Sequence, residues 1–134
     1  MENSNKAKKY ELSTHRFLEL YYYCLQYKEW KEELEANQDT MKSVIYDGMP
    51  RGYSGTDATQ NLAIRRMMLS DKCRAIEETA KETDPDIGDY IFEAVTNEDV
   101  TFTFLKMRRN IPCGKDMYYD RKKKFYWLLS QKVK

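Results

Sequence analysis

Apolar residues recur at helical spacing near the start of the chain. After a polar stretch, Ser13 or Thr14 can cap a helix whose apolar positions are separated by charged ones. These apolar positions are Phe17, Leu20, Tyr21, Cys24, Tyr27 and Leu34. The spacing predicts one amphipathic helix of about six turns, within an N-terminal segment spanning residues 1–37.

The aromatic residues of this predicted helix cannot all lie on one face that packs against the core. Tyr21, Tyr22 and Tyr23 are consecutive, and Trp30 follows. Consecutive helical positions point in different directions, so these rings either meet another helix or subunit, or lie half-exposed at the margin of a core. The segment is therefore a candidate for oligomerisation or interaction.

The pattern breaks between residues 38 and 58. This stretch holds three of the five glycines and Pro50, which predicts a linker or loop. Helical spacing resumes near Thr59 and ends at Pro85, and a short apolar face over 86–95 predicts a further helix. Residues 59–134 thus form a predicted helical domain.

The end of this domain has the pattern of two helices joined by a turn. Apolar and polar residues alternate within residues 99–108, as they would in a strand. However, this segment is followed by a break at 110–114 and by a long helical stretch from Lys115 to about Gln131. This order favours a helix-turn-helix at about 99–131. The predicted fold class is all-α: a long N-terminal helix, a Gly/Pro-containing linker, a central helix and a C-terminal helix-turn-helix bundle.

Charge is divided unevenly along the chain. The total is +1, but residues 106–134 hold ten Lys/Arg and two acids, a net charge of +8, which leaves residues 1–105 near −7. Aromatic and aliphatic residues are interleaved with these cations, so the segment can pack as well as bind. This imbalance favours the C-terminal segment as a nucleic-acid interface.

The predicted second helix supplies both readers of bases and anchors for phosphates. Basic side chains can donate to guanine, an acid can accept from cytosine, and tyrosine can contact phosphate or a thymine methyl. We expect DNA contacts from Lys115, Asp116, Tyr119, Arg121, Lys122 and Lys123, with a weaker contribution from Arg51 in the linker. We expect the opposite face to pack through Met117, Tyr118, Phe125, Leu128 and Leu129 against Ile91, Val95, Phe104 and Ile111.

The sequence offers little chemistry for catalysis. It has no Gly-rich phosphate loop and no nucleophile motif, and its single histidine, His15, has no partner set. The three cysteines are far apart and lack zinc spacing. We expect neither an enzyme nor a bound metal or cofactor. With no apolar run long enough to span a bilayer and no signal-peptide core, we expect a cytoplasmic protein with no membrane partner.

Several of these residues together resemble the phage late-transcription regulators of the RinA/ArpU type, found in prophages of low-GC Gram-positive bacteria. The resemblance runs over most of the chain from about residue 12. It rests on three short stretches: Met49-Pro50-Arg51-Gly52 with Asp57-Ala58-Thr59, the turn Ile111-Pro112-Cys113, and the run from Tyr118 to Leu129.

The resemblance implies a helical, double-stranded-DNA-binding activator of late phage genes in the host bacterial cell. Its helix-turn-helix would be similar to the promoter-reading region of sigma factors, with the recognition helix at Lys115 to Lys124 and the preceding helix at Asp99 to Met107. The family often has a Thr-Trp-x-Glu-Val-Ala pattern in that preceding helix, where this chain has Thr101-Phe102-Thr103-Phe104.

Two other functions remain open on the sequence. The aromatic N-terminal helix would suit a phage interaction protein directed at RNA polymerase or a host defence complex. A ring-forming small terminase subunit would also combine helices with a helix-turn-helix. Dimerisation through the N-terminal helix would give a homodimer and a two-fold DNA site.

Overall fold

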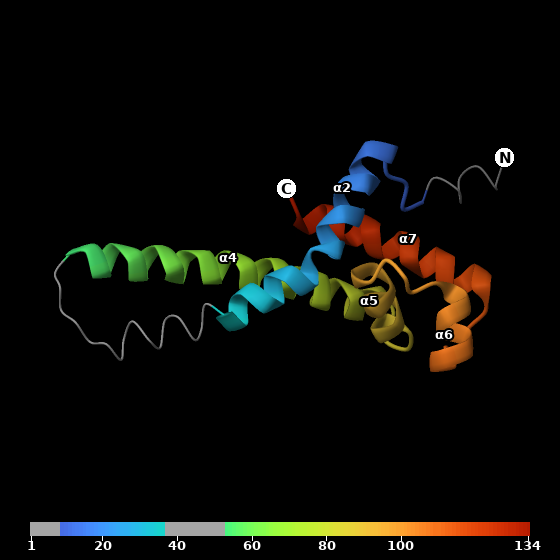
Figure 1. Ribbon diagram of the computed structural model, residues 1–134. Coiled ribbons are helices and arrows are strands. Elements are labelled where there is room, and N and C mark those ends of the chain that lie inside the picture. The colour runs from blue at the N-terminus through green and yellow to red at the C-terminus, as the bar shows by residue number, and fades with distance from the viewer. Residues whose placement is uncertain (1–8, 37–52) are drawn as a thin grey trace. The chain divides into compact units, whose positions relative to one another are not determined.

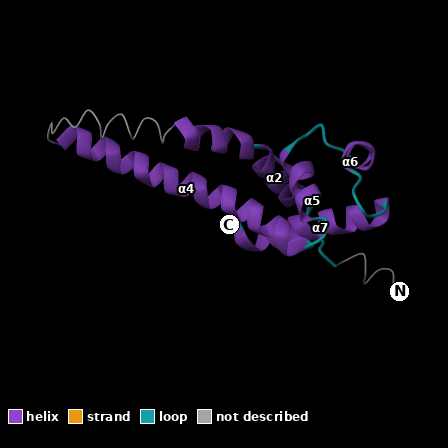
Figure 2. Ribbon diagram, turned by 90° about the horizontal axis from the view of Figure 1, so that it is seen from below, coloured by secondary structure: helices purple, strands orange, loops and turns teal. Residues whose placement is uncertain are grey.

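The computed structural model describes residues 9–36 and 53–134 (Figure 1). Within these ranges the chain is helical with no strand (Figure 2), so the all-α prediction is confirmed there. The helices are α2 (Thr14–Leu25), α4 (Tyr53–Thr83), α5 (Gly88–Thr96), α6 (Phe102–Arg109) and α7 (Lys115–Lys132), and residues 27–36 are helical as well.

The chain divides into two compact units. The main unit contains Met1–Gln26 and Ala75–Lys134, and the hairpin unit contains Tyr27–Arg74. Helix α4 contributes its last turns to the main unit and its preceding turns to the hairpin unit. The basic C-terminal segment lies entirely in the main unit.

Three helices of the main unit, α2, α5 and α7, pack against one another. Each of these helices has apolar residues at helical spacing along one face. Packing the three faces together removes their apolar surface from water. The core includes Leu20 and Cys24 of α2, Ile91 and Val95 of α5, and Tyr118, Phe125 and Leu129 of α7.

The predicted six-turn N-terminal helix is interrupted. Helix α2 ends at Leu25, Gln26 forms a turn, and helix resumes over 27–36. The Gln26 amide donates to the Tyr23 carbonyl, three residues back, at 3.2 Å, and such a bond tightens the last turn of a helix. The two helical stretches belong to different units.

The region predicted as a linker is partly helical. The backbone of α4 begins at Tyr53, inside the predicted 38–58 segment. Residues 37–52, and with them Arg51, lie outside the described residues. The predicted stop at Pro85 agrees with the end of α4 at Thr83.

Helices α4 and α5 approach each other closely at Gly88. A Cβ atom at that position would lie 2.5 Å from the Ala80 carbonyl oxygen, a separation that real Cβ atoms do not tolerate. Glycine is therefore required for this close packing, and it sets the position of α5. Through α5 it also supports α7, which packs on the same helix.

The hairpin unit is held by contacts between the 27–36 helix and α4. Glu33 accepts two hydrogen bonds from Arg65, at 2.7 and 3.0 Å, and the Lys72 ammonium lies 5.1 Å from the Trp30 ring centroid. Because later residues of one helix meet earlier residues of the other, the two run antiparallel. Trp30, Leu69 and Cys73 are buried apolar residues that belong to this unit.

The predicted core face of the last helix needs two corrections, of which the first is that Leu128 is only half-buried. Tyr118, Phe125 and Leu129 are buried as expected, but Met117 is 38% exposed. Met117 immediately precedes Tyr118 in the first turns of α7, and the Tyr118 ring occupies the position that faces the core. On α6, Leu105 is buried, whereas Phe104 is only half-buried.

Candidate nucleic-acid interface

The turn between α6 and α7 is defined by its backbone. Asn110 adopts the left-handed conformation (φ 55°, ψ 45°), which asparagine tolerates better than most residues. The Ile111 amide then donates to the Leu105 carbonyl at 3.2 Å, and both side chains are buried. A backbone hydrogen bond that closes back over the end of a helix, accompanied by apolar side chains, is a common way for a helix to end. This arrangement ends α6 and fixes where α7 begins.

Lys106 reinforces the same turn. Its Nζ donates to the carbonyl of Ile111 at 3.3 Å and to that of Cys113 at 3.4 Å. At the start of α6, the Thr101 hydroxyl accepts from the Phe104 amide at 3.1 Å and caps the helix. The short α6 is thus held at both ends, and the direction of the chain into α7 is well defined.

The first turns of α7 present polar side chains to solvent. Lys115, Asp116 and Lys123 are exposed, and Tyr119 is 49% exposed. Asp116 lies in the first turn, where a carboxylate is stabilised by the helix dipole. Four of the seven residues predicted to contact DNA are therefore accessible on this half of the helix.

Arg121 is engaged within the protein. Its Nε donates to Asp84 Oδ2 at 2.9 Å, and its guanidinium also pairs with Asp120. The other Asp84 oxygen accepts from the amides of Asp86 and Ile87 at 2.8 and 3.1 Å. Arg121 therefore anchors α7 to the segment between α4 and α5, which the run of four basic residues in the sequence did not reveal.

The pKa of Asp84 reflects this arrangement. Burial of the carboxylate raises its pKa, but the hydrogen bonds from Arg121, Asp86 and Ile87 outweigh that effect and hold the pKa below its usual value. Asp84 is 7% exposed, and Asp120 and Arg121 flank it at the surface. The charged form of Asp84 is the one that the fold stabilises.

Lys122 is half-buried and has a different environment from its neighbour. Its ammonium lies 5.7 Å from the Tyr118 ring centroid, and burial lowers the pKa of Lys122 below its usual value. No carboxylate of the described residues forms an ion pair with it. Burial also raises the pKa of the adjacent Tyr118 to about 12.

Some other cations of the C-terminal segment are also paired with carboxylates of the protein. Arg109 of α6 donates to both Glu93 oxygens of α5, with the shortest separation at 2.9 Å, and Lys132 pairs with Glu82 at 2.9 Å. Arg108, on the neighbouring position of α6, is exposed. Arg109 is exposed as well, so its pairing with Glu93, which the sequence did not indicate, is what distinguishes it from Arg108.

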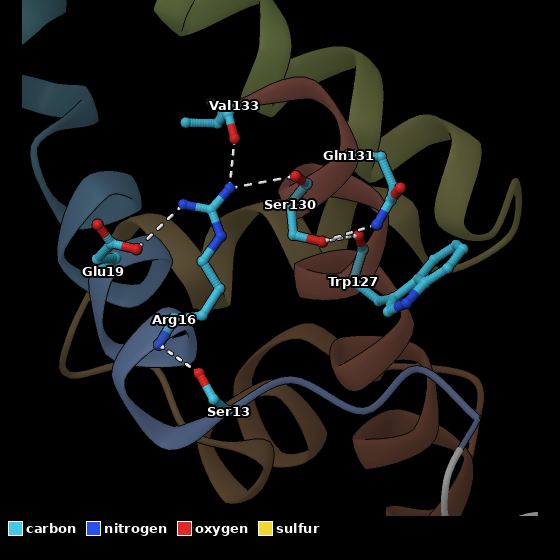
Figure 3. A network of polar contacts seen from close by, with 7 residues as sticks. All are labelled: Ser13, Arg16, Glu19, Trp127, Ser130, Gln131 and Val133. Carbon is cyan, nitrogen blue, oxygen red and sulfur yellow. Dashed lines mark hydrogen bonds and ion pairs between the residues drawn. The ribbon is translucent and has the colours of Figure 1, made fainter.

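The far end of α7 is held by an arginine of α2 (Figure 3). Arg16 Nη2 donates to the Ser130 carbonyl at 3.1 Å and to the Val133 carbonyl, while Nη1 pairs with Glu19 at 3.1 Å. These carbonyls are among those that a helix leaves unpaired at its C-terminus, and a cation there is favoured by the dipole.

The described residues contain no group of three or more His, Cys, Asp or Glu side chains placed to hold a metal ion. None of the described helices combines the length and apolar character needed to cross a membrane.

No protein-family model matches the chain, and neither the curated proteins nor the solved structures compared with it include a match.

Proposed function

We propose that the protein is a sequence-specific, double-stranded-DNA-binding transcriptional regulator of the phage late-gene type, and that α6 and α7 are its helix-turn-helix. The observation that carries the proposal is the combination of two helices running in clearly different directions, a short intervening turn and an exposed polar start of the second helix. In Figure 2, α6 is viewed nearly along its axis, whereas α7 runs across the view.

This arrangement suits the major groove. In helix-turn-helix proteins the second helix enters the groove with its first turns against base edges. Here that position belongs to Lys115, Asp116 and Tyr119, which are exposed. The hydrogen bonds that define the turn hold α6 and α7 in one orientation, which reduces the entropy lost on binding.

The contacts proposed for DNA differ in role. Lys115 and Lys123 of α7 and Arg108 of α6 supply positive charge for phosphates, whereas Asp116 can accept from cytosine N4. Arg121 is assigned a structural role instead. To contact DNA, Arg121 would have to break its ion pair with Asp84, and the buried Asp84 carboxylate would then lack a cationic partner. Of the seven residues expected from the sequence, the proposal removes Arg121 and assigns no DNA contact to Lys122, and Arg51 lies outside the described residues.

The test is a fluorescence-anisotropy titration with duplex DNA from the region around the protein's own gene and with a scrambled duplex, at two salt concentrations. We expect a preference of several hundredfold for the native duplex at physiological salt. Lys115→Ala should lower the log–log salt slope by about 0.9, the value for one phosphate contact.

Lys134→Ala is the matched control, since it removes one positive charge two residues beyond the C-terminal end of α7. Its salt slope should stay at the wild-type value. Asp116→Asn should alter the sequence preference more than the salt slope, because it changes a proposed base contact. Equal, salt-sensitive binding to both duplexes would overturn the proposal.

A second candidate function is binding to a protein such as RNA polymerase. The observation that favours it is the exposed apolar surface of α2, where Phe17, Leu18 and Tyr22 are 37%, 38% and 57% exposed. Exposed aromatic and aliphatic side chains are enriched at protein interfaces. If the duplex titration shows only weak, non-specific binding, purified host RNA polymerase is the next partner to titrate.

A further inference from the structure

A pocket of about 440 Å³ lies between the start of the described chain and α7 in the main unit. It falls within the size range of sites for small organic ligands. Its lining is mostly apolar and contains four aromatic rings: the residues are Tyr10, Leu12, Thr14, Phe17, Tyr119, Lys122, Lys123 and Tyr126.

The aromatic walls are held in place by contacts with the core. Phe17 packs edge-on against Tyr126 with ring centroids 5.0 Å apart, and Tyr126 is 2% exposed. Tyr10 has a positive φ of 63°, unusual for a bulky residue, and its ring lies 5.6 Å from that of Trp127. The walls therefore come from both the segment before α2 and α7.

One side of the pocket carries positive charge. Lys122 is half-buried and Lys123 is exposed, and both line the pocket. Removing an ammonium from water costs free energy unless an anion or hydrogen-bond acceptors replace the water. The Tyr118 ring, 5.7 Å away, supplies a cation–π contact but no negative charge. An anion in the pocket would supply the missing partner.

We propose that this pocket binds a small aromatic anion, whose ring packs against the aromatic side chains that line the pocket and whose acidic group pairs with the ammonium groups of Lys122 and Lys123. The apolar, ring-lined walls favour a planar aromatic body, and the two lysines at one side favour a single anionic group. The pocket shares Tyr119 and Lys123 with the surface proposed for DNA, but its test uses no DNA and does not depend on DNA binding.

The test uses two fluorescent probes that differ by one group. 1-Anilinonaphthalene-8-sulfonate carries a sulfonate, and N-phenyl-1-naphthylamine has the same ring system without it. Each is titrated into the full-length protein without DNA. We expect the sulfonate probe to bind with one-to-one stoichiometry and at least tenfold more tightly than the neutral probe, because a charged hydrogen bond contributes on the order of tenfold or more to binding.

Two variants locate the binding. Lys122→Met keeps the length and apolar stem of the side chain but removes the charge, and we expect it to weaken the sulfonate probe about tenfold while leaving the neutral probe unchanged. Lys124→Met makes the same change two positions along α7, at a residue that does not line the pocket, and should bind as wild type. Thermal melts establish that both variants are folded.

The position of the probe is read from amide chemical shifts. Shifts confined to residues around Phe17, Tyr119, Lys122 and Tyr126 support the proposal. Equal affinity for the two probes, equal effects of the two lysine variants, or the absence of saturable binding would each overturn it. Saturation by a glutamate-rich peptide without binding of the sulfonate probe would also overturn it, because the occupant would then be an acidic peptide.

Discussion

The two halves of α7 differ in composition and in exposure, and both acids of the helix, Asp116 and Asp120, lie in the first half. The first half, from Lys115 to Lys123, exposes Lys115, Asp116 and Tyr119, whereas the second half buries Phe125, Tyr126 and Leu129. Both halves contain basic and aromatic residues. Tyr118 of the first half is buried too, but the second half contacts α2 directly, since Tyr126 packs against Phe17 and Arg16 binds the carbonyls of Ser130 and Val133.

A similar contrast holds between adjacent residues. Arg121 is matched by Asp84 at 2.9 Å, and Lys122, the next residue, faces Tyr118 and the pocket. In a run of four basic residues each side chain points in a different direction. The net charge of a segment therefore does not show which of its cations are available to a partner.

The largest effect is expected from truncation of the buried half. Phe125→Ala should lower the free energy of unfolding by about 3–5 kcal/mol, because it removes a fully buried ring and leaves a cavity. Tyr119→Ala, in the exposed half, should change it by less than about 0.5 kcal/mol. Urea denaturation followed by circular dichroism measures both. Similar losses in the two variants would show that the halves do not differ in burial.

A smaller effect is expected at the Asp84–Arg121 pair. Asp84→Asn should cost about 2–3 kcal/mol at neutral pH, because it leaves the Arg121 charge without its partner and weakens the acceptor for two amides. Chemical denaturation at neutral pH measures the loss. Asp120→Asn, on the exposed side of the same arginine, is the matched control and should cost much less.

The same pair predicts a dependence on pH. Because the pKa of Asp84 is lower in the folded protein than in the unfolded chain, its contribution is fully present above the unfolded pKa of about 3.9 and is lost as the pH falls through the folded value. The difference in stability between wild type and Asp84→Asn should therefore shrink on acidification. A difference that stays constant from neutral to strongly acidic pH would contradict this assignment.

The smallest of the three effects concerns the C-terminus of α7. Arg16→Met keeps most of the apolar stem but removes the donors to Ser130 and Val133, and should cost about 1–2 kcal/mol. The variant should also increase amide hydrogen exchange in the last turn of α7 more than in its first turn. Uniform exchange along α7 would indicate that Arg16 does not stabilise this end selectively.

The sequence alone determined the helical class and most helix limits of the C-terminal region. Pro85, the break at 110–114 and the spacing of Tyr118, Phe125 and Leu129 are local signals, and helix formation depends mainly on residues three and four positions apart. The accessibility of Lys115, Asp116 and Tyr119 follows from the same periodicity. The proposed DNA function and family resemblance stay predictions.

Tertiary structure decided which charges are matched and which faces are covered. The pairing of Arg121 with Asp84 joins residues 37 positions apart, and the Arg16 contact with Val133 joins residues 117 positions apart. The pocket beside Lys122 likewise depends on how the segment before α2 meets α7. Periodicity carries no information about such distant partners, because they are set by packing between elements rather than by spacing within one.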